Sequence, residues 1–168
     1  MKTSHIITAL KAFNPTVRKI TGIIIHCSAT KEGQDFCAKD INRWHKDRGF
    51  NGIGYHFVIK LDGTIEIGRQ LALRGAHTTG HNKETIGICY IGGLDADGRA
   101  KDTRTDEQKE ALLWLVEAIR MHLPAGLGLS VKGHRDYSPD KNGDGVIDKY
   151  ERIKECPCFD VIPEFSND

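Results

Sequence analysis

Short apolar runs alternate with amphipathic segments along this chain, and the alternation predicts a domain of mixed α/β type. Residues 22–26 form a short apolar run that ends in a polar residue, and residues 85–92 form a second apolar run; both have the length expected for buried strands. Residues 55–60 predict a further strand. The turn signal at residues 61–63 lets residues 64–67 pair back on that strand as a hairpin.

Two segments carry the signals of helices. Residues 39–48 predict one helix, with Gly49 as its stop. Thr105 and Gln108 form the capping-box pattern that opens the longest helix. Its apolar positions then recur at three- and four-residue spacing, at Leu112, Leu115, Val116, Ile119 and Leu123. Residues 129–134 predict a last strand, so the expected fold is a single α/β domain with a central mixed β-sheet flanked by α-helices.

Composition narrows the possible partners. Lys plus Arg number 24 and Asp plus Glu number 23, a balance that gives no electrostatic case for a nucleic-acid partner. No stretch reaches the roughly 18 apolar residues of a membrane span, so no membrane insertion is expected. The N-terminal apolar stretch is broken by Lys11, Asn14 and Pro15, which is unlike a signal peptide. We therefore expect synthesis in the cytoplasm and one domain over residues 1–168, with its core at about 20–162.

Two histidines end predicted strands, and both are candidate metal ligands. His26 follows the first apolar run and His134 follows the last. Sites in open α/β sheets gather beyond the strand ends. Two imidazoles with the thiolate of Cys156 could hold zinc and leave a fourth position open for water. Each residue alone is a weak signal, because a single strand-end histidine usually has a structural role. Free core thiols are expected at Cys27, Cys37 and Cys89.

Five sequence segments carry a resemblance to a known family. They are IIIHCSAT (23–30), INRWHKDRGFNGIGYHFVIKLDGTI (41–65), RGAHTTGHNKETIGICYIGG (74–93), KGHRD (132–136) and KECPCFD (154–160). In this order they resemble the zinc-dependent N-acetylmuramoyl-L-alanine amidases, which include phage endolysins and peptidoglycan-recognition proteins. The resemblance implies hydrolysis of the amide between the lactyl group of N-acetylmuramic acid and L-alanine in peptidoglycan. It spans most of the chain.

The resemblance also implies roles for individual residues. Zinc ligation is carried over to His26, His134 and Cys156, with Cys156 preferred to Cys158 because it directly precedes the proline of the C-P-x-F-D motif. Zinc supplies a nucleophile at neutral pH and polarises the carbonyl. A non-catalytic peptidoglycan-binding module is the alternative function, and that alternative would expect the cysteine to be replaced.

Three further residues take roles from the same motifs. Tyr55 matches a catalytic tyrosine, which would orient water or assist proton transfer. Lys154 matches a catalytic lysine, whose charge would face a developing oxyanion. His77 matches a position that lines the substrate groove. Taken singly, Tyr55 would be an edge-strand aromatic and Lys154 a surface lysine. We expect a monomer that acts in phage or prophage lysis, released by a companion lysis protein, or in cell-wall turnover.

Between the second histidine and Cys156 lies a segment with the pattern of an EF-hand calcium loop, residues 140–151. Its ligand positions are filled by Asp140, Asn142, Asp144, Val146 through its carbonyl, Asp148 and Glu151. Pro139 precedes the first ligand, so no entering helix is expected, and a short helix is expected at 149–155. The sequence therefore predicts a bound Ca²⁺ that orders the insertion and fixes Lys154 and Cys156. The alternative is an Asx-rich turn without an ion.

Overall fold

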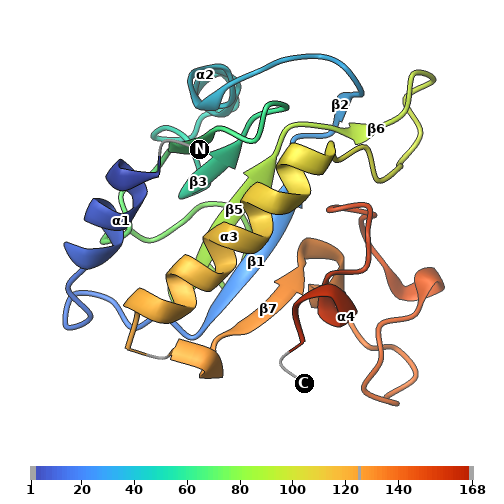
Figure 1. Cartoon of the computed structure of the whole chain (residues 1–168). Coiled ribbons are helices and arrows are strands. Elements are labelled where there is room, and N and C mark those ends of the chain that lie inside the picture. Colours follow the sequence, from blue (N-terminus) through green and yellow to red (C-terminus); the bar gives the residue numbers. More distant parts are fainter. Residues whose placement is uncertain (1–2, 125, 167–168) are drawn as a thin grey trace.

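The computed structural model describes residues 3–124 and 126–166 and contains a central five-stranded sheet in the order β4-β3-β5-β1-β7 (Figure 1). The strands are β1 (Gly22–Cys27), β3 (Phe57–Ile59), β4 (Ile65–Ile67), β5 (Thr85–Tyr90) and β7 (Ser130–Gly133). β1 is parallel to both β5 and β7, and β5 is parallel to β3. β4 runs antiparallel to β3. The predicted α/β fold with a mixed sheet is confirmed.

Burial explains why the inner strands are mostly apolar. Every residue of β1 and of β5 is buried. Parallel strands covered on both faces read as continuous apolar runs, as these do. The predicted hairpin is also present, with the amide of Lys60 donating to the carbonyl of Thr64 at 3.0 Å. β3 begins only at Phe57, so Tyr55 lies just before the strand and not within it.

Helices cover both faces of the sheet. α1 (Ser4–Lys11) and α3 (Asp106–His122) lie on one face, as Figure 1 shows, and pack on a core that includes Ile23 and Ile25. α2 (Ala38–Asp47) packs on the other face through Ile41, against Val58 and Cys89. Side chains alternate along a strand, so His26 shares the α2 face with Ile24.

The capping box that opens α3 forms as predicted. The Thr105 hydroxyl accepts from the Gln108 amide at 3.1 Å, and the Gln108 side chain accepts from the Thr105 amide at 3.1 Å. The same Gln108 side chain donates to the carbonyls of Ile59 and Ile91 at 3.2 and 2.9 Å. The cap therefore also anchors the start of α3 to the sheet.

Several elements differ from the sequence expectations. α1 and the short C-terminal helix α4 (Val161–Phe165) were not predicted, and the core extends beyond 20–162 because Ile6 and Phe165 are buried in it. A second sheet pairs β2 (Thr30–Lys31) with β6 (Gly93–Leu94). The helix expected at 149–155 is only a 3-10 turn over Lys149–Glu151.

Candidate metal centre and its cleft

The three predicted zinc ligands meet at the edge of the sheet where the parallel strands end. His26 is the fifth residue of β1, His134 directly follows β7, and Cys156 lies on the segment that leads to α4. One ligand atom from each of the three lies within 4.8 Å of the other two. Two nitrogens and one sulfur are a donor set that zinc favours and calcium does not. The donor chemistry therefore fits a zinc ion.

Backbone hydrogen bonds hold Cys156 in this position. The Arg135 amide donates to the Cys156 carbonyl at 2.8 Å, which ties the cysteine to the residue after His134. The Cys27 amide donates to Cys156 Sγ at 3.3 Å, which ties the sulfur to the end of β1. Cys158 faces elsewhere, with its Sγ atom 3.8 Å from Cys27 Sγ. The choice of Cys156 over Cys158 therefore agrees with the geometry.

Both histidines are held in the neutral form that binds metals. Burial lowers the pKa of His26 well below its usual value, and the neighbouring His77, His134 and Lys154 act in the same direction. Burial lowers the pKa of His134 to about 4, with the charge of Lys154 adding to the effect. Metal binding requires an unprotonated imidazole nitrogen. These rings therefore need not lose a proton to bind metal near neutral pH.

Tyr55 and Lys154 border the same cleft. A cavity of about 430 Å³ is lined by both residues together with His134 and Cys156. The Tyr55 ring centroid lies 5.0 Å from that of His26, and burial raises the pKa of its phenol well above the usual value. Tyr55 is therefore a neutral hydroxyl beside the metal centre. The two residues that the sequence assigned to catalysis flank the three candidate ligands.

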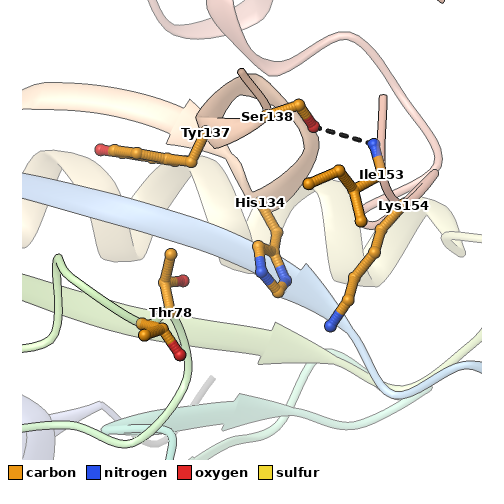
Figure 2. Close-up of a pocket in the computed structure, with 7 residues that line it drawn as sticks. Thr78, His134, Tyr137, Ser138, Ile153 and Lys154 are labelled. Atoms are coloured by element: carbon orange, nitrogen blue, oxygen red, sulfur yellow. Dashed lines mark hydrogen bonds between the residues drawn. The ribbon is translucent and has the colours of Figure 1, made fainter. Parts of the chain in front are cut away.

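A smaller hollow of about 160 Å³ extends from the cleft past His134 (Figure 2). Thr78 lines one side, and Tyr137 and Ser138 line the other. The Ser138 hydroxyl accepts from the amide of Ile153 at 3.0 Å, which closes the base of the segment inserted between His134 and Cys156. Figure 2 shows Lys154 on this closed base, beside the ring of His134. The insertion therefore presents Lys154 to the cleft.

His77 lies beside the candidate metal centre as well as on the cavity wall. The sequence placed it in a substrate groove, and it does line the 430 Å³ cavity. Its Nδ1 atom is also 3.1 Å from Nε2 of His26. Burial lowers its pKa to about 3, so the ring is neutral. This contact was missed from the sequence, because the two histidines are 51 positions apart and no spacing pattern connects them.

Comparisons with known proteins agree with this arrangement. A family model described as N-acetylmuramoyl-L-alanine amidase matches residues 16–157. The chain belongs to this family. The endolysin of Enterobacteria phage K11 is 35% identical over 137 residues, which cover 82% of this chain and 80% of the endolysin. The endolysin of Escherichia phage T7 is 35% identical over 139 residues, which cover 83% of this chain and 81% of that protein.

A solved amidase structure has the same fold. The N-acetylmuramoyl-L-alanine amidase LysC from Clostridium intestinale URNW superposes with a TM-score of 0.63 at 26% identity. The superposition covers 88% of this chain and 83% of LysC. Family membership makes this chain an amidase that acts on peptidoglycan, so the α/β sheet edge described above is the place to look for its active site.

The segment predicted to bind calcium, residues 140–151, uses its carboxylates to accept backbone hydrogen bonds. The Glu151 side chain is buried and accepts from the backbone amides of Lys141, Asn142 and Asp148. Asp140 accepts from the amides of Gly143 and Gly145. Within the described residues, which include all of 140–151, only His26, His134 and Cys156 form a group of three candidate metal ligands. The structure does not support the predicted Ca²⁺ site.

Within residues 3–124 and 126–166, none of the helices combines the length and the apolar character needed to cross a bilayer.

Proposed function

We propose that this chain is a zinc-dependent peptidoglycan hydrolase that cleaves the amide between the lactyl group of N-acetylmuramic acid and L-alanine. The observation that carries the proposal is the meeting of His26, His134 and Cys156 within 4.8 Å. Two of these residues, His134 and Cys156, line a cleft together with Tyr55 and Lys154. A non-catalytic binding module would need neither the thiol ligand nor these two flanking groups.

Each of these residues would have its own role in hydrolysis. Zinc, held by two imidazoles and a thiolate, would activate water and polarise the scissile carbonyl. Lys154 places a positive charge at the mouth of the cleft, where it stabilises the oxyanion that develops on the carbonyl oxygen. Tyr55 keeps its proton near neutral pH, so its hydroxyl donates a hydrogen bond that orients the reacting groups.

The relatives also support a proposal for the biological setting. Endolysins of phages K11 and T7 align with more than four fifths of this chain, which supports a role in phage or prophage lysis. Release to the wall would then depend on a companion lysis protein. We also propose that residues 1–168 act as one amidase domain and as a monomer.

Hydrolysis of purified sacculi tests the proposal. Wild-type protein loaded with zinc should release peptides with a free N-terminal L-alanine, and a chelator should stop the release until zinc is restored. His26→Ala removes a ligand and should abolish the reaction, whereas His122→Ala, at the end of α3, should leave it unchanged. Release of reducing sugar ends, without peptides that carry a free N-terminal L-alanine, would overturn the proposed bond specificity. Full activity after chelation would overturn the metal dependence.

Calcium binding by residues 140–151 stays a prediction of the sequence. The pattern of ligand positions supports it, while the folded loop satisfies Glu151 with backbone amides instead. A role for calcium in fixing Lys154 and Cys156 therefore depends on a direct binding measurement.

A further inference from the structure

The ring of His77 makes the closest side-chain hydrogen bond to the first candidate zinc ligand. His77 Nδ1 lies 3.1 Å from His26 Nε2, and the two rings are nearly perpendicular, with an interplanar angle of 80°. The next candidate partner of this nitrogen is the hydroxyl of Thr78, at 3.4 Å. His26 is 1% exposed, so few other groups can reach it.

The position of the other ligand decides which way this hydrogen bond runs. Cys156 Sγ lies 3.8 Å from His26 Nδ1, so Nδ1 is the nitrogen that faces the metal centre. A neutral imidazole that binds metal through one nitrogen carries its proton on the other. His26 Nε2 therefore donates, and His77 Nδ1 accepts. This tautomer places the proton of His77 on its own Nε2, which is buried and has no hydrogen-bond partner among the described residues.

Two glycines leave the space that the His77 ring occupies in this orientation. A Cβ atom added at Gly75 or at Gly87 would lie 2.5 Å from Cδ2 of His77, well inside contact distance. The backbone is fixed as well, because the Asn82 side chain accepts from the amides of His77 and Thr78 at 2.7 and 2.9 Å. Glycine at Gly87, in the middle of the buried strand β5, is explained by the space that the ring requires.

We propose that His77 is a positioning residue that accepts the Nε2 proton of His26 and so fixes the tautomer and ring orientation that bind zinc. The inference rests on the proposed zinc dependence and adds a role that is separate from lining the cleft. Partners that orient a ligand histidine commonly change metal affinity by roughly 10- to 100-fold when removed. His77 would thus act on zinc affinity even when no substrate is present.

A pair of variants of equal shape isolates the hydrogen bond. Asn and Leu side chains branch alike, but His77→Asn places its amide oxygen where Nδ1 stood, whereas His77→Leu offers no acceptor. Zinc dissociation constants are measured by competition with a coloured chelator, without substrate. Circular dichroism of each metal-free variant verifies the fold. His122→Ala, far from the centre on α3, controls for the loss of a histidine.

We expect His77→Leu to weaken zinc binding by roughly 10- to 100-fold, and His77→Asn to retain affinity within a few-fold of wild type. His122→Ala should match wild type. Equal affinities for the Leu and Asn variants would overturn the positioning role, whether both are normal or both are weak. A wild-type chain that binds no zinc would instead overturn the proposed function, and this inference with it.

Discussion

The backbone amide of Cys27 donates a hydrogen bond to Cys156 Sγ at 3.3 Å, joining two residues that are 129 positions apart. Cys27 ends β1, while Cys156 follows the segment inserted after His134. The candidate metal centre is therefore completed only when the C-terminal segment docks against the central strand. Groups on distant parts of the chain are brought together by the fold and not by a local motif.

Cys156 and Cys158 should differ in their effect on zinc binding, because only Cys156 belongs to the candidate ligand group. Cys156→Ser should reduce zinc affinity by more than the roughly 100-fold limit typical of residues outside the ligand set, because it removes the thiolate donor. Cys158→Ser should leave zinc affinity near wild type, since Cys158 contacts Cys27 Sγ and lies outside the ligand group. Zinc content after dialysis measures both. Equal loss in the two variants would contradict the assignment of Cys156.

Lys154 should matter for turnover and not for zinc. Replacement by methionine keeps the length of the side chain and removes the charge at the cleft. We expect kcat to fall by about 10²- to 10³-fold, the effect of losing one oxyanion-stabilising group, with zinc content unchanged. Turnover of sacculi and metal content are measured on the same preparation. Unchanged kcat would remove Lys154 from the catalytic role, and lost zinc would point to a structural role.

Buried histidines should make the metal-free protein sensitive to mild acid. Burial lowers the pKa of His56 and of His77 to about 3, from 6.5 for an unperturbed ring. Below pH 6.5 the unfolded chain takes up protons that the folded chain excludes, so stability falls as the pH falls. The loss approaches about 1.4 kcal/mol per pH unit for each such histidine.

Urea unfolding of the metal-free protein at about pH 7 and about pH 5 measures this loss, in a range above the usual carboxylate pKa values. His77→Asn removes one titrating ring and should give a smaller difference between the two pH values. A free energy of unfolding that stays constant from neutral pH to pH 5 would show that these rings are not held neutral by the fold.

Glu151 provides a test of the inserted loop. Its side chain is 1% exposed, and its carboxylate accepts hydrogen bonds from three backbone amides. A hydrogen bond to a charged group contributes at most about 1.5–3 kcal/mol. Glu151→Ala should therefore lower the free energy of unfolding by a few kcal/mol. If the sequence pattern also binds calcium, adding Ca²⁺ should raise the melting temperature of wild type but not of the variant. No shift with millimolar calcium would leave Glu151 as a structural carboxylate alone.

The sequence predicted those parts of the fold in which local patterns carry the information. The sequence alone reveals the apolar runs of β1 and β5 and the capping box at Thr105. Each of these patterns lies within a few consecutive residues and does not depend on distant parts of the chain. Helix α1 was missed, although Ile6 and Leu10 stand four apart and both are buried. Four apolar residues in eight, Ile6, Ile7, Ala9 and Leu10, gave too weak a period to separate a helix from a broken apolar stretch.

The candidate site divides in the same way. His26, His134 and Cys156 were found from strand ends and from family motifs, and the structure brings them together. The contact between His26 and His77 could not be predicted, since it depends on the packing of a loop against β5 through two glycines. Hydrogen bonds across 51 residues leave no periodic signal. The form of the inserted loop was likewise beyond a motif that lists only ligand positions.

The central claim is that two imidazoles and the thiol of Cys156 bind one zinc ion. X-ray absorption at the zinc edge of the loaded protein tests it most directly, because sulfur and nitrogen ligands differ in distance, at about 2.3 and 2.0–2.1 Å. We predict one sulfur and two imidazole nitrogens in the wild type, and no sulfur in Cys156→Ser. A wild-type zinc shell without sulfur, or one that keeps its sulfur in Cys156→Ser, would contradict the account.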